Sequence, residues 1–307
     1  MLKLQTQVTD EKCKVHISYE DKILMIGSCF TDNVGQKLSD YGFDVCINPF
    51  GTLYNPVSIA RSIARLSSGK HFTEDECVWM GSNAGKVCSF WHHTSFARTS
   101  TAEFLDNANR RLDEASEFFA NCSKVIITLG TAWYYRYDGQ EAAAESPSSS
   151  YRGTVVSNCL KRKATEFVRE RLTVEECTAE LLKISDSASS RQMIFTVSPI
   201  RHMADGAHGN QLSKSTLLLG VDRMTRSLSD DQDSPAPDYF PAFEIMMDEL
   251  RDYRFYAEDM VHPSSQAVDY IADRFLGWAL PENEKTVLEE RIKKFRQSRH
   301  VSSYRNI

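Results

Sequence analysis

Five short apolar runs, separated by amphipathic segments, constrain the fold of this chain more than any other feature. The runs lie at 23–26, 43–47, 125–129, 194–197 and, less apolar than the others, Tyr253–Tyr256. They are rich in β-branched or aromatic residues and lack the polar–apolar alternation of a half-wetted strand, which favours strands covered on both faces. Parallel strands need crossover connections, and helices supply them. We therefore predict an α/β fold of three layers with a mostly parallel five-stranded sheet.

Two of the intervening helices have clear start signals. Ser100 and Glu103 form a capping-box pattern ahead of apolar residues at helical spacing, and Thr173 and Glu176 form another. In this pattern a hydroxyl and a carboxylate satisfy two free amides at the helix N-terminus. The sequence thus predicts helices that begin after these boxes.

Other segments interrupt the strand–helix alternation. Residues 70–98 place apolar stretches on either side of the turn-like sequence GSNAG, which predicts an inserted β-hairpin. Residues 138–153 and 228–238 are rich in Ser, Pro and Asp and are expected to be exposed loops. We therefore expect one domain over 1–280, followed by an amphipathic surface helix and tail over 281–307.

Composition and charge exclude several classes of protein. The 307 residues are 41% hydrophobic, enough for a core, and carry a net charge of −6, which gives the chain no bulk attraction to nucleic acid or anionic membrane. No apolar run approaches the ~20 residues of a membrane span or the ~7 to 15 of a secretory signal. We expect a cytoplasmic protein without nucleic-acid or membrane partners, whose eight cysteines are reduced, mostly buried thiols lacking any Cys-x-x-Cys pair.

The segment ILMIGSCFTDNVGQKL carries the first chemical signal. Its strand runs directly into Gly27 and Ser28 and then into an amphipathic helix. A hydroxyl at this turn lies at the carboxyl edge of the sheet, beside helix amides that favour developing negative charge. Two interpretations fit this segment alone: Ser28 is an acyl-transfer nucleophile, or it only caps the helix.

The segment FYAEDMVHPSSQAV carries the second signal. Asp259 and His262 are three residues apart just before Pro263, which suits the first position of a following helix. On such a turn the carboxylate can orient the imidazole. Together with Ser28, these residues supply the nucleophile, base and anion that base-assisted acyl transfer requires. The Asp-x-x-His spacing itself is common, and its place in the predicted fold is what gives it weight.

Five longer motifs occur in a fixed order. They are GSCF at 27–30, NPFGTLYNP at 48–56, ITLGTAW at 127–133, SPIRH at 198–202 and DMVHPSS at 259–265. Together they resemble the GSCFA family, a branch of the SGNH/GDSL-type hydrolases, over roughly residues 20 to 280. The resemblance implies a flavodoxin-like, SGNH hydrolase-like domain over 1–280 that needs no cofactor.

The resemblance also implies roles for residues at the matching positions. Ser28 is the nucleophile, His262 the base, Asp259 the residue that orients it, and Gly51 a backbone donor to the oxyanion. The third motif departs from the wider SGNH group, which has Gly-x-Asn-Asp where this chain has Gly-Thr-Ala-Trp at 130–133. One oxyanion donor contributes about 10² to 10³ in rate. Thr131 or Asn55 can substitute for the missing Asn, or the enzyme is slow; we favour Asn55.

Other candidate residues have competing interpretations. Cys29 adjoins Ser28, but successive residues at such a turn point in different directions, which argues against a thiol nucleophile. The histidines at 92, 93, 202 and 208 lack metal-ligand spacing, and we predict no metal. His202 either contacts substrate or is a loop histidine bonded to backbone. Arg201 binds an anionic substrate group or is a surface arginine. Trp133 and the tyrosines after it are core and rim aromatics or a sugar-stacking surface.

The sequence thus predicts a hydrolase acting on ester bonds through a Ser-His-Asp triad. Its substrate would be a small-molecule or carbohydrate ester, with O-acetyl groups favoured. The alternative is a catalytically silent binding module of the same fold, motivated by the absent Asn of the third motif. A phosphate binder is disfavoured because GSCF lacks both the extended glycine loop and the Lys of a phosphate-binding loop. The acyl group, the alcohol and the oligomeric state are not predicted.

Overall fold

The computed structural model describes residues 6–9, 12–81, 85–139, 151–229 and 236–304. Its strands are β1 (Lys22–Gly27), β2 (Asp44–Ile47), β3 (Val78–Trp79), β4 (Val87–Cys88), β5 (Lys124–Leu129), β6 (Trp133–Tyr137), β7 (Val155–Val156), β8 (Phe167–Arg171), β9 (Gln192–Val197) and β10 (Asp238–Phe240). Its α-helices are α1 (Cys29–Asp40), α2 (Pro56–Ser68), α3 (Thr101–Asn121), α4 (Val174–Ser187), α5 (Gly206–Ser229), α6 (Ala242–Glu244), α7 (Ser265–Ala279) and α8 (Glu282–Tyr304). Short 3-10 turns are η1 (Glu74–Glu76), η2 (Thr94–Phe96), η4 (Ala164–Glu166), η5 (Met203–Asp205) and η7 (Tyr253–Phe255), and η6 (Ile245–Glu249) is a π turn.

The main sheet is parallel throughout and confirms the predicted fold class. Its strand order is β2-β1-β5-β9-β10, which corresponds to the flavodoxin-like order 2-1-3-4-5. The register pairs Gly27 with Thr128 and Thr128 with Thr196, so β1, β5 and β9 end together. The order reverses between β1 and β5. In open sheets of this kind, ligands bind at the carboxyl ends of the strands beside that reversal.

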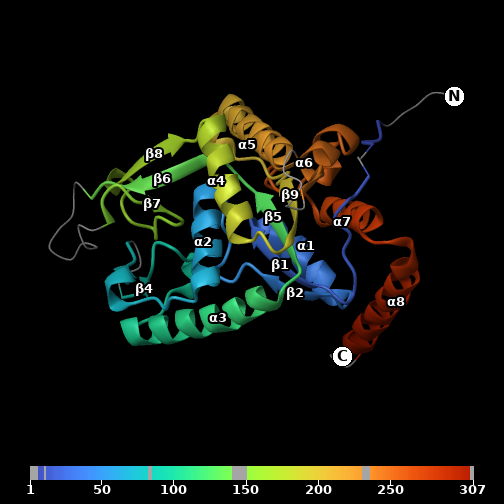
Figure 1. Cartoon of the computed structure of the whole chain (residues 1–307), viewed down its shortest axis with the longest axis horizontal. Helices are drawn as coiled ribbons and strands as arrows, with labels where there is room; N and C mark the ends of the chain where they lie inside the picture. The colour runs from blue at the N-terminus through green and yellow to red at the C-terminus, as the bar shows by residue number, and fades with distance from the viewer. Residues whose placement is uncertain (1–5, 10–11, 82–84, 140–150, 230–235, 305–307) are drawn as a thin grey trace.

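Helices cover both faces of the sheet, as the unbroken apolar runs predict. Along β1, Leu24 and Ile26 pack in a core that includes buried residues of α2, α3, α4 and α5, whereas Ile23 and Met25 pack in a second core with α1 and α7. Figure 1 shows the sheet between these two groups of helices. The alternation along a single strand therefore distributes its side chains between two cores.

One of the five strands lies elsewhere than predicted. Tyr253–Phe255 forms the 3-10 turn η7, and Tyr256 joins Pro263 in a single antiparallel bridge. The fifth strand is β10, which starts at Asp238 in a segment expected to be an exposed loop. Asp238 is buried, and its carboxylate accepts hydrogen bonds from the amides of Lys14 and Val15 at 2.6 and 2.7 Å. This partner lies more than two hundred positions away, so local composition does not reveal it. At the other end of the expected loop α5 continues to Ser229, and residues 230–235 lie outside the described part of the chain.

Two small antiparallel sheets extend the domain. β3 and β4 pair within the segment expected to form a hairpin, although its turn residues 82–84 lie outside the described residues. β6, which follows β5 directly, lies between β7 and β8 in a three-stranded sheet that the sequence did not predict. Of the expected loop at 138–153, residues 140–150 are not described.

The capping boxes differ in how they are completed. Thr173 Oγ1 accepts from the Glu176 amide at 3.1 Å, and the Glu176 carboxylate accepts from the Thr173 amide at 2.8 Å. Ser100 likewise accepts from the Glu103 amide, but the Glu103 carboxylate accepts instead from the hydroxyl of Thr99. Both helices begin where predicted, and in each the N-cap hydroxyl satisfies the N3 amide.

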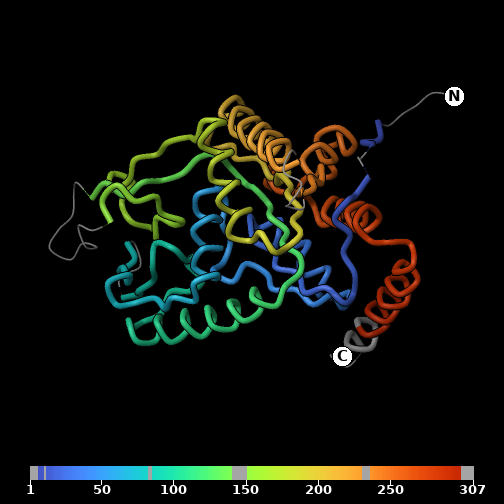
Figure 2. Tube along the Cα trace, viewed as in Figure 1, coloured from blue at the N-terminus to red at the C-terminus, as the bar shows by residue number. Residues whose placement is uncertain are grey.

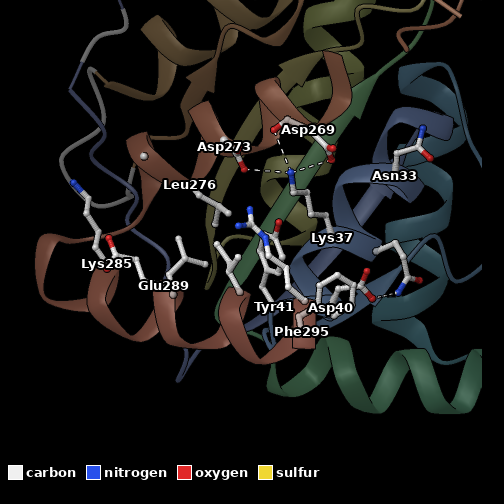
Figure 3. A pocket seen from close by; sticks show the side chains of 15 residues that line it. Asn33, Lys37, Asp40, Tyr41, Asp269, Asp273, Leu276, Lys285, Glu289 and Phe295 are labelled. Atoms are coloured by element: carbon white, nitrogen blue, oxygen red, sulfur yellow. Dashed lines mark hydrogen bonds and ion pairs between the residues drawn. The ribbon is translucent and has the colours of Figure 1, made fainter. Parts of the chain in front are cut away.

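The C-terminal helix α8 packs beside α1 and α7 and leaves a groove between the three helices, which we call the α8 groove. Its volume is about 890 Å³, and its walls include Tyr41 directly after α1, Leu276 of α7 and Phe295 of α8. Figure 3 shows Lys37 in this groove between Asp269 and Asp273. Figure 2 shows the N-terminal segment running alongside α7, where the Ile17 amide donates to the Ala279 carbonyl.

Candidate active site

Ser28 lies where the sheet reverses its strand order. It is the N-cap of α1, and its Oγ accepts a hydrogen bond from the Phe30 amide at 3.3 Å. Gly27 before it cannot carry a side chain, since a Cβ there would lie 2.2 Å from the carbonyl oxygen of Thr128. Ser28 is 1% exposed, and its own amide donates to that same carbonyl at 3.3 Å. The hydroxyl therefore lies at the carboxyl edge of β1, beside the positive end of a helix dipole.

Asp259 and His262 form a bonded pair on a tight turn before α7. Asp259 Oδ2 accepts from His262 Nδ1 at 2.6 Å, and Oδ1 accepts from the amides of Val261 and His262, both at 2.9 Å. The two amides, followed by the imidazole, lower the pKa of Asp259 to about 2. The turn also holds Met260 at a φ of +58°, a left-handed conformation that non-glycine residues adopt at a cost. An ionised carboxylate thus fixes the orientation of the imidazole and leaves its Nε2 for another partner.

The turn bearing His262 packs against the loop that leaves β9. The Arg201 amide donates to the Val261 carbonyl at 3.2 Å. The structure therefore brings His262 to the same edge of the sheet as Ser28. Within the described residues, no hydrogen bond joins the Ser28 hydroxyl to the His262 ring, so the structure brings together the Asp–His pair but not the complete triad.

Gly51, Thr131 and Asn55, the oxyanion donors expected from the sequence, differ in whether their donor groups already have hydrogen-bond partners. The Gly51 amide donates to the Asn48 carbonyl at 2.7 Å. Thr131 Oγ1 lies 3.0 Å from Ser213 Oγ and accepts from the Trp133 amide.

Asn55 is the N-cap of α2, where its Oδ1 accepts from the Ser58 amide at 2.9 Å. In the described part of the chain, its Nδ2 donates to no other group. Among the three expected donors Gly51, Thr131 and Asn55, the Asn55 side chain thus offers a donor without a partner in the described residues.

His202 lies near His262 and carries an unsatisfied ring nitrogen. Its Nε2 is buried and has no hydrogen-bond partner in the described structure, while its amide donates to Asn210 Oδ1 at 2.9 Å. Burial, then the charge of Lys214, lowers the pKa of His202 to about 4, and His262 contributes in the same direction. The Tyr54 ring packs edge-on at 6.2 Å between centroids. His202 is therefore a neutral imidazole beside the Asp–His turn.

Arg201 and the aromatic residues of β6 are the other candidates that the sequence predicts for substrate binding. Arg201 has a buried Nε without a hydrogen-bond partner, and no carboxylate of the described residues pairs with it. The Arg169 guanidinium lies 4.3 Å from the centre of the Trp133 ring and pairs with Asp205. Tyr135 on β6 is 40% exposed. The aromatic rim is thus partly covered by an arginine.

Three buried polar residues of α5 were not anticipated from the sequence. Asn210, Ser213 and Lys214 are each 1% exposed and lie on one face of the helix. Ser213 Oγ accepts from the Ala132 amide at 2.8 Å, and Lys214 Nζ donates to the carbonyls of Gly130 and Ser198. Their i, i+3, i+4 spacing is a signal, but the same spacing is typical of a solvent-exposed face.

Cys29 and the histidine at 92 lie in buried or half-buried surroundings. Burial raises the pKa of the Cys29 thiol, which disfavours the thiolate that a nucleophile needs. His92 is buried, with Nδ1 2.6 Å from Ser89 Oγ. Among the described residues, no three His, Cys, Asp or Glu side chains lie close enough to hold a metal ion. All eight cysteines are free, but only those at 88, 122 and 177 are fully buried, fewer than expected.

Comparisons with known proteins give one family match. The model of the GSCFA family matches residues 22–275. No curated protein matches the chain. Among solved structures, the chain is similar to an acetyl xylan esterase from the rumen bacterium Butyrivibrio proteoclasticus, with 13% identity and a TM-score of 0.35. That match covers 85% of this chain and 63% of the esterase. Among the described helices, none is both long and apolar enough to cross a membrane.

Proposed function

The chain belongs to the GSCFA family, and from this premise we propose that it is a serine esterase or deacylase. The observation that supports the proposal most is the bonded Asp259–His262 pair, which lies at the same edge of the sheet as Ser28. A hydroxyl at a helix N-terminus and an imidazole oriented by an ionised carboxylate are the parts that acyl transfer requires. The substrate is an ester of a small molecule or a carbohydrate.

In the proposed reaction Ser28 Oγ attacks the acyl carbon, and its proton passes to Nε2 of His262. The tetrahedral intermediate collapses as His262 returns that proton to the leaving alcohol, which leaves an ester on Ser28. Water then attacks this ester with His262 as base, and a carboxylic acid and free Ser28 are released. Asp259 holds the imidazole and stabilises its charged form throughout. No cofactor enters these steps.

The proposed oxyanion donors are Asn55 Nδ2 and His202 Nε2, both of which have no partner in the described structure. Gly51 contributes its amide only if that amide leaves the Asn48 carbonyl. The substrate must also reach Ser28, which is buried, whereas the side chain of His262 is 48% exposed. We expect the turn bearing His262 to move toward Ser28 when an ester binds, because catalytic hydrogen bonds often tighten only with substrate present.

O-acetyl groups on carbohydrate are the substrates that we favour. Tyr135 is exposed and Trp133 is half-buried on the strand that follows the β5 loop, and aromatic faces of this kind stack on sugar rings. Arg169 lies over the Trp133 ring and 5.6 Å from the centre of the Tyr135 ring, so a sugar would stack on the aromatic surface that this arginine leaves exposed.

The test compares the purified full chain with its Ser28→Ala variant. We expect the wild type to hydrolyse p-nitrophenyl acetate and the variant to lose about three or more orders of magnitude in rate. A fluorophosphonate probe should label the wild type at Ser28 and leave the variant unmodified. Equal hydrolysis by the two proteins contradicts the mechanism. A folded wild type that neither hydrolyses esters nor reacts with the probe would instead be the silent binding module.

A further inference from the structure

We propose that Lys214 is a positioning residue of this active site: it clamps the loops that leave β5 and β9, and its charge stabilises negative charge developing beside Ser28. The inference rests on the proposed esterase function. It concerns a residue on α5, outside the five sequence motifs.

The clamp consists of two short hydrogen bonds. Lys214 Nζ donates to the Gly130 carbonyl at 2.6 Å and to the Ser198 carbonyl at 2.7 Å. These carbonyls belong to the residues directly after β5 and β9, two paired neighbours of the sheet. The loops after these strands bear Thr131 and His202. One ammonium therefore sets the spacing of two loops at the carboxyl edge.

Two neighbouring side chains of α5 complete the clamp. Ser213 Oγ accepts from the Ala132 amide, which belongs to the loop after β5. Asn210 Oδ1 accepts from the His202 amide, which belongs to the loop after β9. All three polar side chains are excluded from water, where an unsatisfied polar group is costly, and each is satisfied by a loop of the candidate site.

The charge of Lys214 has no ionic partner in the described structure. The carboxylate of Asp205, which acts on it through space, is paired with Arg169. The Phe243 ring of α6 lies 5.9 Å from Nζ and gives a weak cation–π contact. A buried charge held only by carbonyls is costly. That cost is consistent with a role in stabilising an anion that forms during the reaction.

The field of Lys214 extends to the turn that bears Ser28. Burial and then the charge of Asp32 raise the pKa of the Cys29 thiol, and the charge of Lys214 contributes a smaller, opposing effect. The same charge helps to lower the pKa of His202. An oxyanion formed on the acyl group of Ser28 would lie in this field, which strengthens where water is excluded. With the third-motif Asn absent and the Gly51 amide engaged, such a field compensates for missing donors.

The first experiment removes the charge. Lys214→Met keeps an unbranched side chain but removes the ammonium, and we expect kcat for p-nitrophenyl acetate to fall about 10- to 100-fold with KM changed less than about threefold. The control is Leu217→Ala, one turn further along α5, which leaves a cavity in the core and removes no charge or hydrogen bond. Leu217→Ala should lower the melting temperature and leave kcat unchanged at 25 °C.

The second experiment uses the titration of Lys214. Burial lowers its pKa to about 7, with Cys29 and Asp205 opposing the shift. In wild type, kcat should therefore fall as the pH rises above about 7, because the ammonium loses its proton. Lys214→Arg cannot deprotonate and should retain activity without this alkaline fall. An alkaline fall that persists in Lys214→Arg, or a folded Lys214→Met variant with wild-type kcat, overturns the inference.

Hydrogen exchange separates this inference from the proposed function. Amides in the loops at 130–133 and 198–202 should exchange faster in Lys214→Met than in Leu217→Ala. If Lys214→Met does not fold, the pH profile and exchange of Lys214→Arg provide the test. If the wild type shows no Ser28-dependent hydrolysis, the proposed function and the charge-stabilising role of Lys214 are both contradicted. If loop exchange in Lys214→Met is unchanged, the clamp is contradicted, whether or not hydrolysis occurs.

Discussion

In the α8 groove Lys37 pairs with two carboxylates, whereas at the carboxyl edge of the sheet several buried polar groups have no hydrogen-bond partner among the described residues. Lys37 Nζ lies 3.0 Å from Asp269 and 3.2 Å from Asp273, and its side chain is only 14% exposed between them. The volume of the groove is about 890 Å³, but the charge of Lys37 in it is already paired.

The carboxyl edge has the opposite character. His202 Nε2 and Arg201 Nε are buried without hydrogen-bond partners in the described structure, and Lys214 is held by carbonyls alone. Folded proteins rarely leave buried polar groups unsatisfied, so each such group calls for a function or a ligand. At the candidate site the unsatisfied groups of Arg201 and His202, and not the volume of a hollow, support the proposed function.

The largest expected effect comes from one substitution made in both regions. Asp259→Asn removes the anion that orients His262, and we expect kcat to fall by about 10³ to 10⁴. Asp269→Asn makes the same change in the α8 groove, where the side chain is similarly exposed, and should leave kcat unchanged. Steady-state hydrolysis of p-nitrophenyl acetate measures both. Similar losses in the two variants would contradict the distinction between the regions.

The next effect concerns the oxyanion donor. Asn55→Ser keeps a hydroxyl that can cap α2 but removes the Nδ2 donor, so we expect kcat to fall about 10²-fold. Thermal unfolding checks the cap: Asn55→Ser should melt close to wild type, while Asn55→Ala should lose both activity and stability. If Asn55→Ser retains full activity, His202 or the field of Lys214 supplies the stabilisation without Asn55.

The fold follows from the sequence wherever burial on both faces produces an unbroken apolar run. β1, β5 and β9 fulfil that condition and begin and end within two residues of the predicted limits. The sequence does not predict β10, because this strand has three residues and starts with Asp238. The buried carboxylate of Asp238 is satisfied by the distant N-terminal segment. Tyr253–Phe255 has strand-like composition but forms the turn that leads to Asp259.

The candidate site is predictable only in part, for a related reason. Ser28, Asp259 and His262 lie in motifs next to predicted strand or helix ends, where their position follows from the fold. Lys214 lies in the interior of a helix with polar residues on several faces, and nothing local distinguishes it from a lysine exposed to water. Its role depends on where Gly130 and Ser198 lie, and therefore on tertiary structure.

A smaller effect concerns stability in acid. Burial lowers the pKa of His202 to about 4 and that of His92 to about 3, against ordinary values of 6.5. Between pH 6.5 and these values the unfolded chain binds more protons than the folded one, so stability decreases as pH falls. Each histidine contributes a slope of about 1.4 kcal/mol per pH unit. Urea unfolding at several pH values gives the slope of the free energy of unfolding against pH. This slope should decrease by the equivalent of about one proton in His92→Gln and in His202→Gln. An unchanged slope contradicts the neutral, buried state of the histidine.

The smallest effect is expected in the α8 groove itself. Lys37→Met removes the ion pairs with Asp269 and Asp273, whose side chains are each 65% exposed, so water screens much of the interaction. The substitution also removes the contact of Lys37 Nζ with the Tyr41 ring, 5.7 Å from its centre, and we expect a change in the free energy of unfolding below about 1 kcal/mol, with kcat unchanged. Lys214→Met is the matched substitution at the carboxyl edge, since the same lysine becomes the same methionine in a buried setting. If Lys37→Met lowered kcat as much as Lys214→Met, the α8 groove and the carboxyl edge would be coupled. That result would contradict the functional distinction between the two regions.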